Sequence, residues 1–172
     1  PTVDWLLENG AKQIVIAGHI GRPEKPDPNL STEKLLPALE NILGREIEFS
    51  DQPENANQEA RIILLENLRF WLGEEANDFS FAKELAALAD VYVNDAFSVC
   101  HREHASVVAL AGLLPHGAGL HLEEEVSQLT NLINNPQRPM VAIVGGAKLE
   151  TKIPVIDNLS RVADWVLVGG AI

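Results

Sequence analysis

Two lysines, Lys148 and Lys152, stand four residues apart behind a pair of glycines, Gly145 and Gly146. The glycines follow an apolar run at residues 141–144, which is rich in β-branched side chains and predicts a buried parallel strand. Glycine lets the backbone turn sharply beside a ligand, and a helix start offers free N–H groups and a positive dipole end to an anion. Lysines four residues apart share one helix face. The pattern therefore predicts a phosphate-binding site, and the plainer alternative is two solvated lysines on a surface helix.

Basic side chains also follow three other predicted strands. Ligands of open parallel α/β sheets bind beyond the carboxyl ends of the strands. The chain has only 13 Lys and Arg and a net charge of −12, so basic residues gathered at one edge are hard to explain as random surface charge. Arginine binds phosphate or carboxylate through two parallel hydrogen bonds. We therefore predict a site for a small, multiply anionic metabolite. The side chains concerned are His19, Arg22, Arg69, His101 and Arg102, together with the two lysines.

Each of these residues also has a structural explanation. His19 could be a satisfied histidine at the end of a strand. Arg22 precedes Pro23 and could be a solvated loop residue. Arg69 could simply form an ion pair with Glu66, although we favour a binding role for it.

The segment after the fourth predicted strand carries other candidates. His101, Glu103 and His104 have a spacing that could bind zinc, but no further cluster of ligands is evident and we predict no metal site. Cys100 could be a nucleophile beside His101, yet small buried thiols are much commoner. Asp95 could be a general base, but it is more typical of a residue that orders its loop.

Composition narrows the class of protein. The 172 residues are 46% hydrophobic with scattered charge, which indicates a globular chain with one good core or two small ones. We find no run long enough to span a membrane and no signal peptide. A single cysteine excludes an internal disulfide and fits a reducing cytoplasm. The acidic net charge argues against nucleic acid, anionic lipid or heparin as partners. Because the chain opens on Pro1 and stops just after Gly169–Gly170, we expect a fragment of a longer protein.

Helix and strand patterns alternate from end to end, which predicts an α/β fold with parallel strands and right-handed crossovers. Ser31 should cap the second helix, but Pro37 moves its regular part to near Leu35. Pro154 removes an internal hydrogen bond if its helix starts at Lys148, and costs little if the helix starts near Thr151. Helices are predicted over residues 1–9, 31–43, 79–89 and 122–133, with a last helix that starts at Lys148 or near Thr151. Strands are predicted over residues 13–18, 46–50, 62–65, 91–93, 139–145 and 164–170.

At these residues the chain closely resembles the phosphoglycerate kinase family in its bacterial form. Five motifs occur in the family's order and cover nearly the whole chain. They are residues 19–23 (HIGRP), 64–70 (LLENLRF), 92–97 (YVNDAF) with 101–104 (HREH), 145–148 (GGAK) with Lys152, and 169–170 (GG).

The resemblance implies two Rossmann-like, three-layer αβα lobes joined by a helix. Residues 1–118 would form the lobe that binds 3-phosphoglycerate, residues 119–136 the interlobe helix, and residues 137–172 the beginning of the nucleotide-binding lobe. The implied reaction is reversible phosphoryl transfer between 1,3-bisphosphoglycerate and ADP, giving 3-phosphoglycerate and ATP, with Mg²⁺ carried by the nucleotide. The family also implies a monomer.

The resemblance also implies roles for individual residues. In the first lobe, 3-phosphoglycerate would be held by His19, Ile20, Gly21, Arg22, Arg69 and Arg102. In the second lobe, the nucleotide would be bound by Gly145, Gly146, Ala147, Lys148, Lys152, Gly169 and Gly170, with Lys148 and Lys152 as the catalytic residues.

Several departures from the family's pattern bear on activity. The family's first strand, with its Asp and Asn ligands and a following Arg, would stand before Pro1, and most of the nucleotide lobe would follow Ile172. We therefore expect the isolated chain to be inactive and of low stability. Ser98, Cys100, Pro154 and Ala171 are unusual at their positions. Two other readings stay open. The chain could be a non-catalytic α/β module that binds a phosphorylated metabolite, or a phosphosugar enzyme of another fold, which would explain the basic edge but not the five ordered motifs.

Overall fold

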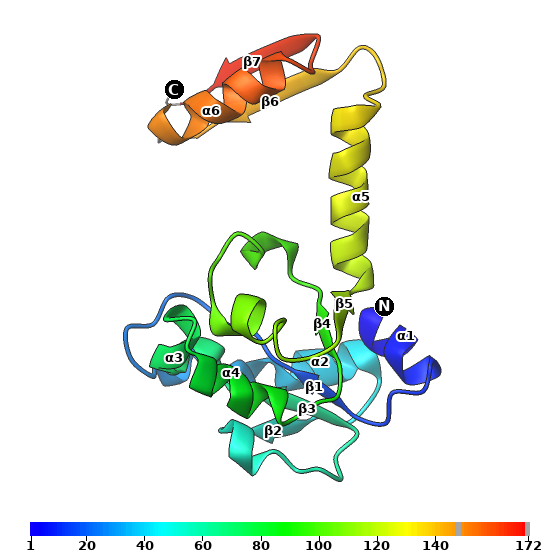
Figure 1. Cartoon of the computed structure of the whole chain (residues 1–172), viewed down its shortest axis with the longest axis vertical. Helices are drawn as coiled ribbons and strands as arrows, with labels where there is room; N and C mark the ends of the chain where they lie inside the picture. Colours follow the sequence, from blue (N-terminus) through cyan, green and yellow to red (C-terminus); the bar gives the residue numbers. More distant parts are fainter. Residues whose placement is uncertain (147–148, 171–172) are drawn as a thin grey trace. The chain divides into compact units, whose positions relative to one another are not determined.

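The computed structural model of the chain describes residues 1–146 and 149–170 (Figure 1). These residues fall into two compact units, Pro1–Glu123 and Glu124–Ile172, and each is described by itself. Ala147, Lys148 and Ala171 were singled out from the sequence and lie outside the described residues.

Parallel strands form the sheets of the first unit, as the alternating pattern predicted. Strand β3 (Ile62–Leu65) lies between β1 (Ile14–Ile16) and β2 (Glu48–Ser50) and pairs with both in parallel. Strand β4 (Tyr92–Asn94) pairs in parallel with β5 (His116–Ala118) in a second, separate sheet. In the described part of the chain, no strand ladder joins these two sheets.

Helices cover both faces of the three-stranded sheet (Figure 1). Helices α1 (Thr2–Glu8) and α2 (Leu36–Leu43) pack on one face, and α4 (Phe79–Ala86) with the π-helix Ala105–Ala109 packs on the other. The short helix α3 (Leu72–Glu75) precedes α4. The three-layer α/β class is therefore confirmed. Single 3-10 turns occur at Pro28–Leu30, Thr32–Leu35, Pro53–Asn55, Leu68–Phe70 and Phe97–Val99.

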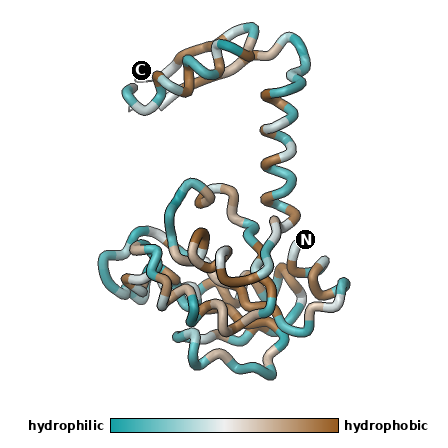
Figure 2. Tube along the Cα trace, viewed as in Figure 1, coloured by the Kyte–Doolittle hydropathy of each residue, from teal (hydrophilic) through white to brown (hydrophobic). Residues whose placement is uncertain are grey.

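The core is built around β3, whose four residues are all buried. Ile63 and Leu65 belong to the cluster that contains Phe81, whereas Ile62 and Leu64 belong to the cluster that contains α1 and α2. A fully buried aliphatic side chain contributes about 1.5–3 kcal/mol to folding, so this strand contributes to both clusters that stabilise the unit. Figure 2 shows hydrophobic segments gathered around these strands.

The regular part of the second helix begins close to the predicted Leu35, but Ser31 caps a separate 3-10 turn before it rather than the α-helix. The Ser31 hydroxyl accepts a hydrogen bond from the Glu33 backbone N–H at 3.2 Å and caps a 3-10 turn. The α-helix proper begins at Leu36, so Pro37 falls in the first turn, where no N–H is needed. Gly44 ends the helix in the left-handed region with φ 61°.

The second unit contains a βαβ arrangement. Helix α5 (Leu120–Asn134) begins in the first unit and continues into the second unit. Strands β6 (Val141–Gly145) and β7 (Trp165–Gly169) pair in parallel, and α6 (Leu149–Ser160) connects them and packs on both. Pro154 lies inside α6, so the helix begins early enough for this proline to remove an internal hydrogen bond.

Two short elements of the first unit were missed by the sequence prediction. Strand β5 has only three residues, His-Gly-Ala, with no apolar alternation, and α3 is a single turn that contains Gly73. Such short segments are too short to carry a periodic signal. Contacts with other parts of the fold, rather than local preference, form them.

Candidate functional site

Asn67 fixes the loop that follows β1 against the end of β3. This fully buried amide donates hydrogen bonds to the carbonyl oxygens of Ile20 at 2.9 Å and Leu30 at 2.8 Å. Its Oδ1 accepts a hydrogen bond from the Arg69 backbone N–H at 3.1 Å. In the same region, the Leu68 N–H donates to the Gly18 carbonyl at 3.0 Å. The predicted ligands at residues 19–22 are thereby held beside Arg69.

Glu66 holds a different part of the same loop. Its carboxylate accepts hydrogen bonds from the Ser31 hydroxyl at 2.7 Å and from the Thr32 backbone N–H at 2.9 Å. Arg69 instead forms its ion pair with Glu75, so the suggested pairing of Arg69 with Glu66 is wrong. The carboxylate of Glu66 is already occupied by donors that come from far upstream in the sequence.

Arg69 is a buried cation, with 4% of its side chain exposed. Its Nη1 donates to the Gly21 carbonyl at 2.5 Å, and its Nε lies 3.1 Å from Oε1 of Glu75. Gly21 has φ +67°, and a Cβ there would lie 3.1 Å from a methyl group of Leu30, so this close turn requires glycine. The guanidinium is thus held at the loop that carries the other predicted ligands.

Arg69, Arg102 and His104 all lie near enough to His19 to act on it electrostatically. Burial lowers the pKa of His19, and the charges of Arg69, His104 and Arg102 lower it further, while Glu75 opposes the shift. His19 is therefore neutral at pH 7 and can accept or donate a hydrogen bond. The structure brings these predicted site residues together.

Arg22 is exposed and lies one residue beyond the Gly21 carbonyl that Arg69 binds. This places Arg22 on the same loop as His19, with its side chain accessible to a ligand. The exposure agrees with either of its two interpretations, a ligand or a solvated loop residue.

Glu74 joins α3 to the segment that follows Arg102. Its carboxylate is buried, accepts hydrogen bonds from the Ser106 N–H at 3.0 Å and hydroxyl at 2.6 Å, and lies 3.6 Å from Nδ1 of His104. Sequence reasoning missed Glu74, Glu75 and Asn67 as parts of the site. No local pattern distinguishes these two acids from the other acidic residues of the chain.

The other candidates near β4 have structural roles. Asp95 accepts hydrogen bonds from the N–H groups of His121 and Leu122 and from the Thr2 hydroxyl, which agrees with an ordering role. Cys100 is exposed, so the expectation of a buried thiol is wrong. Its Sγ contacts the Ala96 carbonyl at 3.5 Å and Nδ2 of Asn94 at 3.6 Å.

A second group of predicted ligands meets at the carboxyl ends of β6 and β7. Gly145 pairs with Gly169 in register, and a Cβ on Gly145 would lie 3.2 Å from the Gly169 carbonyl oxygen. A Cβ on Gly146, which has φ +139°, would lie 3.2 Å from Cε of Lys152. Gly170 has φ +82° and faces the Gly146 nitrogen. The side chain of Lys152 therefore lies over Gly146, where no glycine side chain covers the backbone, as a phosphate site requires.

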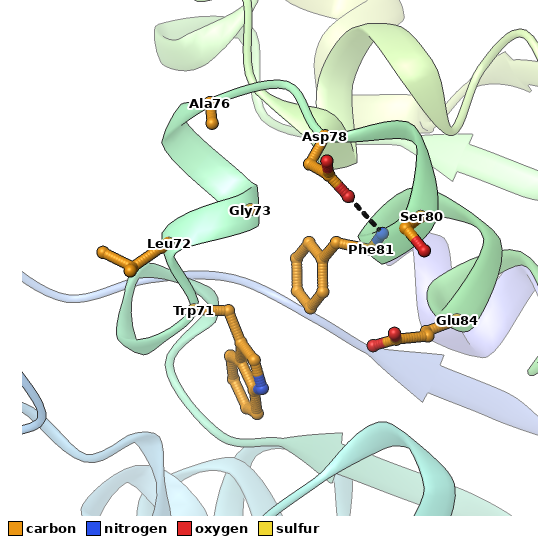
Figure 3. A pocket seen from close by; sticks show the side chains of 8 residues that line it. All are labelled: Trp71, Leu72, Gly73, Ala76, Asp78, Ser80, Phe81 and Glu84. Carbon is orange, nitrogen blue, oxygen red and sulfur yellow. Dashed lines mark hydrogen bonds between the residues drawn. The ribbon is translucent and has the colours of Figure 1, made fainter.

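A surface pocket of about 390 Å³ lies between α3 and α4 (Figure 3). Trp71 and Phe81 stack beside it with ring centroids 5.7 Å apart, and Asp78 caps α4 through the Phe81 N–H at 2.9 Å. The lining residues are Trp71, Leu72, Gly73, Ala76, Asp78, Ser80, Phe81 and Glu84. Its charged groups are carboxylates, so this pocket does not suit an anion. A similar pocket of about 400 Å³ is lined by Pro26, Asp27, Pro28, Ser31, Glu33, Lys34, Glu66 and Phe70.

Two further properties concern only residues 1–146 and 149–170. No helix there is long and apolar enough to cross a membrane. No group of three or more His, Cys, Asp or Glu side chains is placed to hold a metal ion. His104 contacts Glu74, and His101 is exposed, so the two histidines considered for zinc have different surroundings.

The fold and these residues define an α/β protein with basic side chains and glycine turns beyond the carboxyl ends of parallel strands, a class that includes phosphotransferases. The sequence model of the family described as phosphoglycerate kinase matches residues 1–172. The chain belongs to the phosphoglycerate kinase family.

Individual relatives agree with this assignment. A protein of Wolbachia pipientis subsp. Culex pipiens named phosphoglycerate kinase is 45% identical over 180 residues, which cover 100% of this chain and 45% of that protein. Phosphoglycerate kinase 1, chloroplastic, of Arabidopsis thaliana is 44% identical over 179 residues, which cover 99% of this chain and 37% of that protein. The phosphoglycerate kinase structure from Coxiella burnetii superposes with a TM-score of 0.85 at 35% identity, over 99% of this chain and 44% of that one. The chain thus spans less than half the length of these relatives.

Proposed function

We propose that this chain carries the 3-phosphoglycerate site and part of the nucleotide site of a phosphoglycerate kinase. The reaction is the reversible transfer of a phosphoryl group between 1,3-bisphosphoglycerate and ADP, a step of glycolysis. The observation that carries the proposal is the buried guanidinium of Arg69 at the end of β3, which acts on His19 together with Arg102. A ligand with a carboxylate and a phosphate supplies the negative charges that these cations need.

The proposed roles in the first unit follow from the surroundings of each group. Arg69 and Arg102, with Arg22 from the loop, bind the carboxylate and phosphate oxygens of 3-phosphoglycerate. His19 is neutral and contributes a hydrogen bond rather than a charge. Ile20 and Gly21 supply the backbone that holds these side chains, because their carbonyl groups accept hydrogen bonds from Asn67 and Arg69.

In the second unit, we propose that the glycine turns and lysines bind the nucleotide. Lys152 neutralises phosphate charge above Gly146, and Lys148, outside the described residues, would act with it. The other proposed contacts are Gly145, Ala147, Gly169 and Gly170. Phosphoryl transfer depends on positioning and charge neutralisation, so it requires no nucleophilic side chain. Mg²⁺ would arrive bound to the nucleotide phosphates and would neutralise part of their charge.

The division of the chain is also part of the proposal. Residues 1–118 form the 3-phosphoglycerate lobe, residues 119–136 the interlobe helix, and residues 137–172 the beginning of the nucleotide lobe. Because the chain spans 45% of the Wolbachia relative, we propose that it binds 3-phosphoglycerate but is inactive alone. The parent protein would act as a monomer in the cytoplasm.

Calorimetric titration of the chain with 3-phosphoglycerate tests the proposal. Arg69→Ala should weaken binding about 10- to 100-fold, because hydrogen bonds between charged partners are lost. Arg45→Ala is the matched control, since Arg45 is an exposed arginine remote in sequence from the predicted ligands. Equal affinities of both variants would overturn the assigned site. If the chain lengthened to the span of its relatives binds 3-phosphoglycerate but transfers no phosphoryl group, the protein is a binding module.

A further inference from the structure

We propose that Glu75 is an internal place-holder for ligand charge, which pairs with Arg69 in the free protein and is displaced when an anionic ligand binds. Glu75 would thereby set the affinity of the site. This inference rests on the proposed binding role of Arg69 and adds a residue that competes with the ligand.

The first observation is the burial of Arg69. Only 4% of its side chain is exposed, and a buried guanidinium without a counter-charge is strongly destabilising. Among the described residues, its recorded partners are the Gly21 carbonyl and the Glu75 carboxylate. Glu75 therefore provides the negative charge that permits this burial before any ligand arrives.

The second observation is the geometry of the contact. Nε of Arg69 lies 3.1 Å from Oε1 of Glu75, yet in the described part of the chain this buried nitrogen has no hydrogen bond of acceptable direction. The contact is a charge pair without a well-directed hydrogen bond. The Nε donor thus stays available to a better-placed acceptor, such as an oxygen of a bound carboxylate or phosphate.

The third observation is that Glu75 can leave without disturbing the fold. Its side chain is 57% exposed, so the carboxylate can turn into solvent. Its neighbour Glu74 anchors the same turn through Ser106 and lies beside His104. The backbone is therefore held while only the Glu75 side chain needs to move.

Charge repulsion supplies the reason for displacement. Glu75 forms an ion pair with Arg69 and also acts electrostatically on His19, so its carboxylate lies next to these basic groups. An anion bound there would bring like charges close to the Glu75 carboxylate. Ligand and Glu75 therefore compete for the same cation.

The experiment compares 3-phosphoglycerate affinity of the wild-type chain, Glu75→Gln and Glu54→Gln by titration calorimetry at low ionic strength. Both variants remove one negative charge, but Glu54 lies in an exposed turn of a different loop. We expect Glu75→Gln to bind about three- to tenfold more tightly, and the control to stay within about twofold of wild type. The Nε–H resonance of Arg69 should shift in free Glu75→Gln, whereas the two saturated proteins should give similar resonances.

The outcomes separate this inference from the proposed function. Equal or weaker binding by Glu75→Gln overturns the place-holder, and weaker binding would instead make Glu75 a residue that orients Arg69. If 3-phosphoglycerate binds neither protein, inorganic phosphate is titrated instead. Tighter phosphate binding by Glu75→Gln would then support the place-holder while the proposed function fails, and equal phosphate binding, or none, would overturn both. Glu75→Ala repeats the comparison if the glutamine variant fails to fold.

Discussion

Gly119 lies directly against the carboxylate of Asp95. A Cβ on Gly119 would fall inside contact distance of that carboxylate, and the backbone there leads straight into α5. Oδ1 of Asp95 accepts hydrogen bonds from the N–H groups of His121 at 2.9 Å and Leu122 at 3.0 Å. Its Oδ2 accepts a hydrogen bond from the Thr2 hydroxyl at 2.6 Å. One carboxylate thus ties the end of β4 to the starts of α1 and α5.

Gly119→Ala should destabilise the first unit by about 1–3 kcal/mol, because the new methyl group must push Asp95 away from the helix start. Urea unfolding followed by circular dichroism measures this change. Gly117→Ala is the matched control, since a Cβ at Gly117 meets nothing within 4 Å. Equal stability of the two variants would mean that the Asp95 side chain can shift away from Gly119 without lowering the free energy of unfolding.

The stabilising effect of Asp95 should depend on pH. Burial acts to raise the pKa of Asp95, but hydrogen bonds from Thr2, Leu122 and His121 outweigh it and hold the pKa below its usual value. Its contribution to stability is therefore present above the unfolded-state pKa of about 3.9, and is lost as the pH falls through the folded-state pKa. The stability difference between wild type and Asp95→Asn should shrink from pH 7 to pH 3 in urea unfolding. Asp90→Asn, an exposed control, should show a smaller change, and a constant difference for Asp95→Asn would contradict the argument.

Asn67→Ala should lower both the affinity for 3-phosphoglycerate and the free energy of unfolding of the first unit. The change leaves the carbonyl groups of Ile20 and Leu30 without their donor and the Arg69 N–H without its acceptor. Each buried unsatisfied group costs about 1–3 kcal/mol, so we expect a loss of roughly 3 kcal/mol or more in urea unfolding. Asn41→Ala, on the exposed side of α2, should lose less than about 1 kcal/mol. If Asn67→Ala retained full 3-phosphoglycerate affinity, the loop would not depend on this amide.

Hydrogen exchange should be faster in the second unit than in the first. The residues of β3 are all buried, whereas Ile143 of β6 is 78% exposed and Trp165 of β7 is 66% exposed. A two-stranded sheet with one helix buries too little apolar surface to resist local opening. Exchange measured by mass spectrometry should therefore show weak protection in peptides from β6 and β7 and strong protection in β3. Equal protection, or a single cooperative melt at ordinary mesophile temperature, would contradict the predicted low stability.

Elements with strong local signals were predictable. The apolar run 62–65 coincides with β3, and Pro37 and Gly44 correctly locate the start and end of α2, whereas Ser31 caps the 3-10 turn before it rather than α2 itself. These signals are local because capping, proline geometry and side-chain periodicity act within one or two turns. Strand β5 and helix α3 were missed because they are short and form through contacts with distant chain.

The site was predictable only in part, as Arg69 illustrates. Its position after a buried strand marked it as a candidate ligand, but the partner suggested from sequence, Glu66, was wrong. Glu66 is already bound to Ser31 and Thr32, and the ion pair forms with Glu75 instead. Cys100 was likewise expected to be buried and is exposed.

By itself, the sequence determined the α/β class, the order of the main strands and helices, and which basic residues follow the strands. Periodicity, capping and residue type are properties of neighbouring positions, and they need no knowledge of the fold. Only the tertiary structure decided which acids neutralise or anchor those basic residues, because Glu74 and Glu75 meet their partners through loops that close between separate elements. Such pairings depend on which groups are desolvated together, and desolvation is a property of the packed chain rather than of any segment.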